Sequence, residues 1–260
     1  MKKTALITGA SSGIGRELAM IHAAAGGDLI LVARSTQKLN ELKTTLESTY
    51  KINAAVITKD LTTPNATHEL YEEVKALGVP VDYLINNAGF GGIGKFLERK
   101  LEEDVNMIQL NVVALTQFTH LFANDFVKRG SGKVLNVSST ASLIPGPLQA
   151  TYYATKAFVT SFSNALSEEL RGTGVTVTNL MPGATDTDFG KVSGMEKTKL
   201  FDAPSSAKQV AQDGYDAMLA GDIDRISGLT FSQKILMKMM PFMPKKMVLK
   251  QVHEMQKVVK

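Results

Sequence analysis

The sequence predicts an α/β protein in which one doubly wound parallel sheet carries helices on both faces. Short β-branched or apolar runs alternate along the chain with longer segments that have helical spacing. Continuous apolar runs are typical of strands buried on both faces, and the alternation of strand and helix is typical of a parallel sheet. No internal repeat, linker or low-complexity stretch interrupts this order, so we expect a single domain over residues 1–260.

Six runs are the predicted strands. In chain order they are TALITG (4–9), LILVA (29–33), NAAVIT (53–58), VDYLIN (81–86), GKVLNVS (132–138) and VTVTNLM (175–181). Between the second and third runs, Leu39, Leu42 and Leu46 fall at the spacing of one helix face. Pro64 indicates the first turn of a further helix, which ends before Gly78.

Composition excludes several kinds of chemistry. The 260 residues are 44% hydrophobic, which is enough for the core of one large domain. There is no cysteine, so disulfides, thiolate zinc sites and thiol nucleophiles are ruled out. The four histidines are widely separated and lack metal-ligand spacing, so we predict no metal site.

Charge and hydropathy indicate where the protein acts. Two lysines precede an apolar patch at the start of the chain, but the patch stops at Gly9, short of the ~7–15 apolar residues of a signal peptide. No segment has the length of a membrane-spanning helix, so a cytoplasmic location is expected. The net charge is +4 without an arginine-rich arm, which favours anionic small molecules over nucleic acid as partners.

A glycine-rich loop follows the first predicted strand. Thr8 to Gly15 read TGASSGIG, and a helical pattern begins directly afterwards. Gly9, Gly13 and Gly15 permit a tight turn whose amide groups, with the helix N-terminus, can hold a pyrophosphate. The spacing G-x-x-x-G-x-G differs from the commoner dinucleotide fingerprint G-x-G-x-x-G, but its place between a strand and a helix favours a Rossmann-like nucleotide site over an ordinary turn.

The second predicted strand ends where many dinucleotide-binding proteins carry an acid for the adenosine ribose. Ala33 and Arg34 occupy this corner instead. An arginine can pair with a 2′-phosphate, so NADP(H) is favoured over NAD(H) as the cofactor. A solvated surface arginine is the alternative.

Residues 149–158, QATYYATKAF, contain two adjacent tyrosines followed by a lysine. On a helix Lys156 approaches both Tyr152 and Tyr153, because residues three and four apart share a face. Spacing alone does not choose between the two tyrosines. It is also compatible with an amphipathic helix that has a buried aromatic face and a solvated lysine.

Taken together in chain order, the motifs make this sequence similar to the short-chain dehydrogenase/reductase family. TGASSGIG resembles the family's nucleotide loop, NNAG at 86–89 its strand-four motif, and Tyr152 with Lys156 its YxxxK pair. The similarity covers about residues 4–190, and its further members are Asp60-Leu61, Asn111, Ser139 (thirteen residues before Tyr152), Pro182-Gly183 and Thr187. The resemblance selects Tyr152 as the family tyrosine and leaves Tyr153 as a packing or pocket-wall residue.

The resemblance implies a catalytic set of four residues. Tyr152 would be the acid/base, Lys156 would lower its pKa and hold the nicotinamide ribose, and Ser139 would orient the carbonyl. Asn111 would support Lys156 through water. A free tyrosine has a pKa near ~10, so a neighbouring ammonium group is needed if the phenol is to exchange protons at neutral pH.

The resemblance also implies a cofactor shell that includes Tyr152 and Lys156. Its other members are Gly9, Ser11, Ser12, Gly13, Ile14, Gly15, Arg34, Asp60, Leu61, Asn87, Ala88, Gly89, Pro182, Gly183, Thr185 and Thr187.

The substrate end is less specific. The segment after Gly183 is polar and weakly periodic, so we expect a substrate lid over about 185–230. FGGIGKF (90–96) adds a flexible apolar rim, which favours a fatty, steroid-like or cyclic carbonyl or alcohol over a sugar. Residues 145–170 resemble the branch of the family that contains 3-oxoacyl and ketosteroid reductases.

Residues 231–260 form a basic, methionine-rich extension that contains six methionines, seven lysines and one acid. Three interpretations remain open: a helix that packs on the protein's own body, a subunit contact, or a basic apolar surface that contacts lipid or an acyl chain. Pro241 and Pro244 argue against one continuous helix.

The leading hypothesis is therefore an NADP-dependent carbonyl reductase or alcohol dehydrogenase. The alternatives are a catalytically idle NADP-binding sensor or scaffold, and a peripheral lipid-binding protein. The helices around Asn111 and after Tyr152 carry apolar faces, and the family's subunit contact is formed by the corresponding helices. We therefore expect a homodimer or homotetramer.

Overall fold

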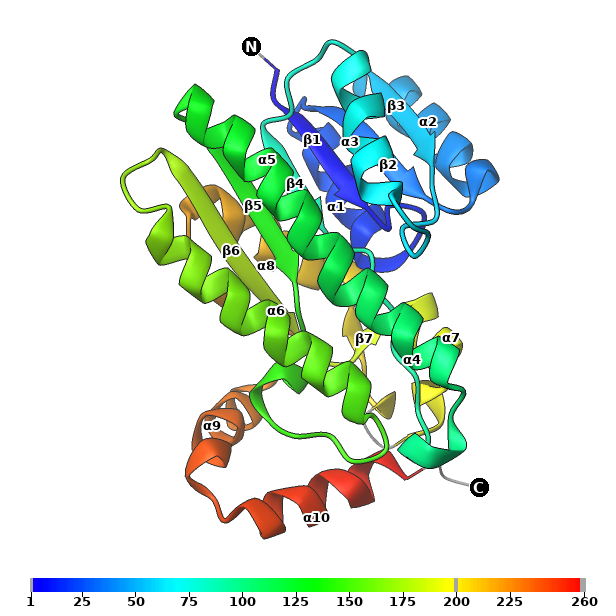
Figure 1. Ribbon diagram of the computed structural model, residues 1–260, viewed down its shortest axis with the longest axis vertical. Helices are drawn as coiled ribbons and strands as arrows, with labels where there is room; N and C mark the ends of the chain where they lie inside the picture. The colour runs from blue at the N-terminus through cyan, green and yellow to red at the C-terminus, as the bar shows by residue number, and fades with distance from the viewer. Residues whose placement is uncertain (1, 199–200, 258–260) are drawn as a thin grey trace.

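The computed structural model describes residues 2–198 and 201–257 (Figure 1). The strands are β1 (Thr4–Thr8), β2 (Asp28–Ala33), β3 (Ala54–Thr58), β4 (Tyr83–Asn86), β5 (Gly132–Val137), β6 (Val175–Pro182), β7 (Thr185–Asp186), β8 (Ser205–Ser206) and β9 (Asp224–Ser227). The α-helices are α1 (Gly13–Ala24), α2 (Thr36–Tyr50), α3 (Ala66–Ala76), α4 (Leu101–Ile108), α5 (Leu115–Arg129), α6 (Ala150–Glu169), α7 (Asp188–Ser193), α8 (Ala207–Ala220), α9 (Phe231–Met239) and α10 (Lys245–Gln256). A π-helical segment, Gln109–Ala114, joins α4 to α5, and short 3₁₀ turns cover Phe96–Glu98, Thr140–Leu143, Met195–Lys197 and Met240–Phe242.

Seven strands form one parallel sheet in the order β3-β2-β1-β4-β5-β6-β9. The strand order reverses between β1 and β4, and in open sheets of this kind ligands bind beside such a reversal, at the carboxyl ends of the strands. The predicted doubly wound Rossmann-like fold is therefore correct. All five residues of β1 are buried, as expected for a central strand covered on both faces.

Helices cover both faces of the sheet and divide the core into two layers (Figure 1). On one face α1, α2 and α8 pack against side chains such as Ile7, Leu31 and Leu135. On the other face α3 and α5 pack against the alternate residues of the same strands, such as Leu6 and Ile30. Side chains alternate along each strand, so one apolar run supplies both layers.

Two predicted helix features have different outcomes. The buried side chains of α2 are Leu39, Leu42 and Leu46, as the spacing predicted. The helix expected to start at Pro64 begins at Ala66 instead. Asn65 has a φ of 61°, and this left-handed residue separates Pro64 from the helix.

The segment predicted as a substrate lid over 185–230 divides into two parts. Residues up to about 206 contain the small β7-β8 pair and α7, close to the carboxyl edge of the sheet. The part from α8 to β9 belongs to the sheet and its helical layer instead, because Val210, Ala211 and Tyr215 are buried in the core. The part of the predicted segment that lines the cavity therefore ends before α8, and its role as a substrate lid stays a prediction.

The C-terminal extension forms two helices, α9 and α10, with a turn at Met240–Phe242 between them. The break at Pro241 and Pro244 agrees with the sequence-based expectation. Both helices lie at one end of the molecule (Figure 1). Residues 258–260, the end of the predicted extension, lie outside the described residues. Within the described ranges no helix has the length and hydrophobicity needed to cross a bilayer.

Candidate active site

A cavity of about 510 Å³ opens at the carboxyl ends of the central strands. It is continuous from the glycine-rich loop to the C-terminal helices. Of the predicted site residues, those that line it are Gly9, Ser11, Ser12, Gly13, Ile14, Arg34, Asp60, Leu61, Asn87, Ala88, Gly89, Ser139, Tyr152, Lys156, Pro182, Gly183, Thr185 and Thr187. Gly15 and Asn111 do not line it.

The glycine-rich loop forms a tight cradle. Gly9 and Gly13 have φ values of 67° and 52°, which glycine adopts far more readily than other residues. A Cβ atom on Gly13 would lie 2.9 Å from the Thr187 side chain, and one on Gly15 would collide with the Gly9 carbonyl oxygen. Gly15 therefore allows close packing within the turn, and Gly13 allows the Thr187 side chain to approach the loop closely.

The N-terminus of α1 faces this cradle. Ser12 is the N-cap residue, and its side chain does not cap the helix. The first turn of α1 contains no acidic residue that would repel an anion. Free amide groups and the helix dipole suit a pyrophosphate, so the loop fits the phosphates of a dinucleotide.

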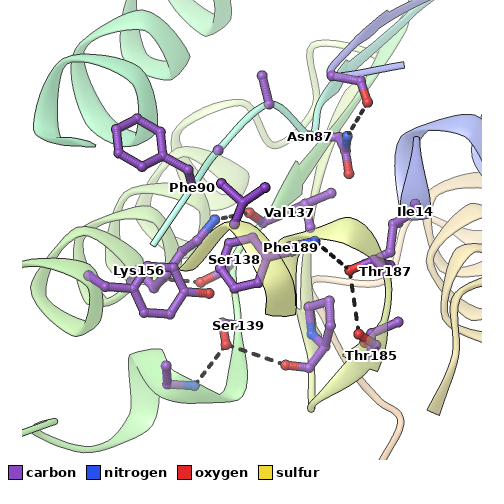
Figure 2. A pocket seen from close by; sticks show the side chains of 18 of the residues that line it. Ile14, Asn87, Phe90, Val137, Ser138, Ser139, Lys156, Thr185, Thr187 and Phe189 are labelled. Carbon is purple, nitrogen blue, oxygen red and sulfur yellow. Dashed lines mark hydrogen bonds between the residues drawn. The ribbon is translucent and has the colours of Figure 1, made fainter. Parts of the chain in front are cut away.

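Thr8 ties the first loop to the loop after β4. Its hydroxyl accepts hydrogen bonds from the backbone N–H groups of Asn87 (3.1 Å) and Ala88 (3.0 Å). The Asn87 side chain donates in return to the carbonyl oxygens of Thr8 (3.0 Å) and Gly9 (3.2 Å). Figure 2 draws one of these two bonds. Thr8 was absent from the predicted site, although it is the first residue of the predicted loop, and its hydrogen bonds fix the glycine-rich loop to the loop after β4.

Basic side chains gather at the end of the cavity beyond β2. Arg34, Lys38 and Lys59 all line this end. Burial alone would raise the pKa of Asp60, but hydrogen bonds from Thr62 and the charge of Arg34 hold it below its ordinary value. The region therefore contains an ionised aspartate within a predominantly cationic surface.

Tyr152 and Lys156 lie together on α6 in a buried environment. The Lys156 ammonium group is 5.9 Å from the centre of the Tyr152 ring and donates a hydrogen bond to the Val137 carbonyl oxygen at 2.8 Å (Figure 2). Burial raises the pKa of Tyr152 to about 12, although the neighbouring Ser139 hydroxyl acts in the opposite direction. Burial lowers the pKa of Lys156 to about 8.

The two serines after β5 have different tasks. Ser138 donates from Oγ to the Lys156 carbonyl oxygen at 3.0 Å and bonds with the Thr160 hydroxyl, so it holds α6 against the strand. Ser139 Oγ accepts from the Ala141 N–H at 3.1 Å and donates to the Pro182 carbonyl oxygen at 3.4 Å (Figure 2). The long bond to Pro182 is weak, which leaves the Ser139 hydroxyl able to turn toward a ligand.

Asn111 lies within the π-helical segment, behind the cavity. Its side chain exchanges two hydrogen bonds with the backbone of Phe90, at 3.1 and 2.9 Å, and donates to the Thr155 hydroxyl at 3.1 Å. Within the described part of the chain no direct hydrogen bond joins Asn111 to Lys156. Asn111 instead fixes the loop after β4 to the residue next to Lys156, and π-helical turns of this kind are frequent at functional sites.

Beyond Tyr152 the cavity becomes apolar. Tyr153 also lines it, and its buried hydroxyl accepts a 2.5 Å hydrogen bond from Gln256 of α10. The large apolar side chains that complete this end are Phe90, Leu110, Ile144, Phe189, Val192, Met195, Phe201, Met237, Met240, Val252 and Met255. Most of them come from α7, the turn after it, and the C-terminal helices. Sequence analysis predicted a lid that includes α7 and left the role of residues 231–260 open, but it named no individual residue of these walls.

Gln149 is a second feature that sequence analysis missed. It lines the cavity and is buried, and its amide oxygen and nitrogen have no hydrogen-bond partner among the described residues. It is the N-cap residue of α6, three residues before Tyr152, and this closeness to the tyrosine in the chain was the available signal.

Comparisons with known proteins agree with this geometry. The short chain dehydrogenase family profile matches residues 3–197. A very-long-chain 3-oxoacyl-CoA reductase of Laccaria bicolor is 38% identical over 180 residues, covering 68% of this chain and 53% of that protein. The human very-long-chain 3-oxoacyl-CoA reductase is 31% identical over 194 residues, covering 72% of this chain and 61% of that protein. The chain thus spans about 53% and 61% of the lengths of these two relatives.

Solved structures resemble the chain over nearly its whole length. A short-chain dehydrogenase from Sphingobium yanoikuyae in complex with NADPH has a TM-score of 0.82 and 28% identity, and the match covers 94% of this chain and 97% of that one. A bulky-bulky ketone specific alcohol dehydrogenase from Comamonas testosteroni has a TM-score of 0.79 and 27% identity, with 92% of each chain covered. The family profile covers well over half of the sequence, and the fold and the order of the motifs agree with it. The chain therefore belongs to the short-chain dehydrogenase family of oxidoreductases.

Proposed function

We propose that the protein is an NADP(H)-dependent oxidoreductase that transfers a hydride between the nicotinamide and the carbonyl group, or secondary alcohol, of an apolar substrate. One observation carries the proposal. A single cavity joins a cationic end, an anion cradle, a buried Tyr152–Lys156 pair and an apolar end, in that order. This order matches the polarity of a phosphorylated dinucleotide that meets an apolar substrate at its nicotinamide.

The residues of α6 would handle the proton. When bound, NADPH supplies the hydride for the carbonyl carbon. Tyr152 donates its phenolic proton to the carbonyl oxygen, and the Ser139 hydroxyl holds that oxygen in reach. Lys156 would bind the nicotinamide ribose, and its charge would favour the phenolate that Tyr152 becomes. Asn111 acts as a positioning residue, because its contacts fix the loop after β4 and Thr155.

Burial explains why a charge must stand beside Tyr152. A pKa of about 12 for the buried phenol makes proton release unfavourable at neutral pH. Each unit by which a neighbouring cation lowers that pKa corresponds to ~1.4 kcal/mol of preferential phenolate stabilisation. Lys156 is the nearest candidate for this cation, since its ammonium group lies 5.9 Å from the ring centre.

Arg34 supports the choice of NADP(H). Within residues 2–198 and 201–257 its guanidinium has no ion-pair partner within 4 Å, while Lys38 and Lys59 at the same end are both paired with carboxylates. The Arg34 guanidinium could therefore pair with a 2′-phosphate without breaking an existing ion pair. The solved Sphingobium relative contains NADPH, which agrees with this choice.

Cofactor titration tests this part of the proposal. An exposed to partly desolvated pair of this kind contributes ~1–3 kcal/mol, or roughly 5- to 150-fold in affinity. We expect the wild type to bind NADPH more tightly than NADH by a factor in this range, and the variant Ala33→Asp/Arg34→Ser to reverse the preference. Arg171→Ser is the control. Arg171 lies in the turn that precedes β6, and so at the amino ends of the strands, away from the cavity, and its replacement should leave both dissociation constants unchanged. Equal dissociation constants for the two cofactors in the wild type at low salt would contradict the assignment.

The substrate class rests on the apolar end of the cavity. Phe189, Met195 and the C-terminal methionines leave few partners for a polyhydroxylated substrate. Relatives described as acting on very-long-chain 3-oxoacyl-CoA and on bulky ketones agree with a large apolar carbonyl compound. We therefore propose 3-oxoacyl thioesters and bulky ketones as the first substrates to test.

The assay is loss of NADPH absorbance with four groups of compounds: 3-oxoacyl thioesters of increasing chain length, ketosteroids, bulky aromatic ketones and sugars. Turnover that increases with apolar size is the expected result. NADPH binding without turnover of any compound would favour a catalytically idle sensor. A homo-oligomeric state and a cytoplasmic location stay predictions from the sequence.

A further inference from the structure

The C-terminal helices have two apolar faces, of which one serves the cavity. Val248, Val252 and Gln256 recur every four residues along α10 and are buried against the body of the protein. Met237, Met240 and Met255 line the cavity beside Tyr153. Through this face the C-terminal helices cover the substrate end of the cavity.

The other face points away from the protein. Phe231, the first residue of α9, is 80% exposed, and Phe242, in the turn between α9 and α10, is 89% exposed. The remaining large apolar side chains exposed in this segment are Ile235, Leu236, Met239, Met247 and Leu249. Single exposed apolar residues are common on protein surfaces, but such a concentration within nineteen residues indicates an interaction surface.

Positive charge accompanies the exposed apolar residues. Lys234, Lys245, Lys246 and Lys250 are exposed in the same segment. Glu254 is the one acidic residue between 231 and 257, and it is paired with Lys257 at 2.7 Å. The lid surface, by which we mean the exposed side chains of residues 231–250, is therefore apolar and cationic at once.

We propose that the lid surface docks on an anionic lipid bilayer. Phenylalanine and leucine side chains partition into the boundary between headgroups and acyl chains, and lysines beside them are attracted to anionic headgroups. A second copy of the chain is a poorer partner, because a twofold contact through this surface would place its lysines against the same lysines of the neighbour.

The position of the surface gives docking a purpose. The side chains that would enter the headgroup region belong to α9, α10 and the turn between them, and the same segment supplies Met237, Met240, Val252 and Met255 to the substrate end. A bilayer-dissolved apolar substrate would thus reach the cavity without crossing water. This advantage rests on the proposed function, whereas docking itself does not and can be measured without turnover.

Co-sedimentation of the full chain with vesicles tests the proposal. Phosphatidylcholine vesicles with and without phosphatidylserine are compared at low and high salt. We expect binding to the anionic vesicles, a weakening of at least about tenfold on raising the salt, and little binding to phosphatidylcholine alone. Phe231→Ser/Phe242→Ser should reduce the partition coefficient about tenfold or more, and Lys245→Glu/Lys246→Glu should reduce it similarly.

The matched control is Leu77→Ser/Val79→Ser. These two residues are also exposed, but they precede β4 and so lie at the opposite edge of the sheet. This control should bind vesicles as the wild type does, and an unchanged melting temperature and NADPH affinity would show that each variant is folded.

Three results would overturn the proposal: no binding to anionic vesicles by the wild type, equal losses in the control and in the Phe231/Phe242 variant, or a dimer that the phenylalanine substitutions dissociate in the absence of lipid. None of these results depends on whether a ketone is reduced, so the proposed function is judged separately.

Discussion

At the scale of single residues, burial acts on Tyr152 and Lys156 in opposite directions. It raises the pKa of the phenol to about 12 and lowers that of the ammonium group to about 8. Both shifts favour the neutral forms, because a low-dielectric site disfavours any charge. The protonation states of both groups should therefore respond to any charge that a bound cofactor or substrate brings into the cavity.

The two adjacent tyrosines allow a direct test of the catalytic assignment. Tyr152→Phe removes only the phenolic proton, so NADPH binding should persist while turnover falls by at least ~10²–10⁴-fold. Tyr153→Phe should retain most of the activity, since the Tyr153 hydroxyl is committed to Gln256. Steady-state kinetics and NADPH fluorescence measure the two effects. The reverse pattern would show that the active site has been assigned to the wrong tyrosine.

Lys156 should also leave a signature in stability. Its pKa is lower in the folded state than in the unfolded chain, so between about pH 8 and pH 10 the unfolded state binds more protons. The free energy of unfolding should consequently rise across this window, by up to ~1.4 kcal/mol per pH unit. Below about pH 8 the buried amine is charged, and its burial then lowers the free energy of unfolding by the full amount. Loss of the proton at higher pH removes this destabilisation.

The comparison protein for this measurement is Lys156→Met, which keeps the length of the side chain but cannot titrate. Urea unfolding at several pH values should give a curve for the wild type that rises relative to the variant above about pH 8. Parallel curves for the two proteins would mean that Lys156 does not titrate in this range.

At the scale of elements, one hydrogen bond joins the C-terminal helix α10 to α6. Gln256 of α10 donates to the hydroxyl of Tyr153 on α6, and both side chains are buried. The neighbour of Tyr153 in the chain is Tyr152. The position of α10 is therefore coupled to the helix that carries the proposed acid/base.

A double-mutant cycle measures this coupling. Gln256→Met leaves the Tyr153 hydroxyl without a partner, and we expect a loss of ~1–3 kcal/mol in the free energy of unfolding. In the Tyr153→Phe background the same change should cost much less, which gives a coupling energy of ~0.5–3 kcal/mol. Gln209→Met, on the exposed face of α8, serves as the control and should stay within ~0.5 kcal/mol. Additive effects at positions 153 and 256 would contradict a linking role.

Sequence patterns predicted six of the seven strands of the main sheet but not β9. Its residues, DRIS, include two charges, and only Ser227 is buried, so no hydrophobic periodicity marks it. Tertiary pairing makes it a strand instead: Gly183 donates to the Ser227 carbonyl oxygen at 2.9 Å, and the Asn179 side chain donates to Asp224 at 2.7 Å. Edge strands that depend on such contacts have little signal of their own.

The candidate site also has a part that the sequence predicts and a part that it does not. Glycines at fixed spacing, the Tyr152–Lys156 pair and Ser139 can be recognised because their chemistry requires those residue types. The residues of the cavity walls cannot be recognised from the sequence, because Phe189 or Met240 has the same hydrophobicity whether it faces a core or a ligand. Their place depends on how α7, α9 and α10 fold back over the sheet.

At the scale of the whole molecule, one flank of the protein retains exposed apolar side chains. Leu101, Val105 and Ile108 on α4 and Phe158 on α6 are all at least 40% exposed. Phe158 stacks on Phe162 of the same helix, with ring centres 5.7 Å apart. A surface of this kind on neighbouring helices is typical of a subunit contact.

We therefore expect light scattering to give a mass of two or four chains. Val105→Lys/Phe158→Lys should shift this mass toward one chain, because it would place like charges in the contact. Leu77→Lys, an equally exposed apolar site at another part of the surface, should not. A mass of one chain for the wild type at every concentration would exclude the predicted association.

The methionines that line the substrate end make this part of the cavity sensitive to oxidation. The chain contains no cysteine, so peroxide finds no thiol to oxidise. Met195, Met237, Met240 and Met255 are thioethers, and oxidation would turn each into a polar, chiral sulfoxide. Oxidation would thus make the apolar walls of the proposed substrate end polar while Tyr152 and Lys156 stay chemically intact, and methionine sulfoxide reductases could reverse the change.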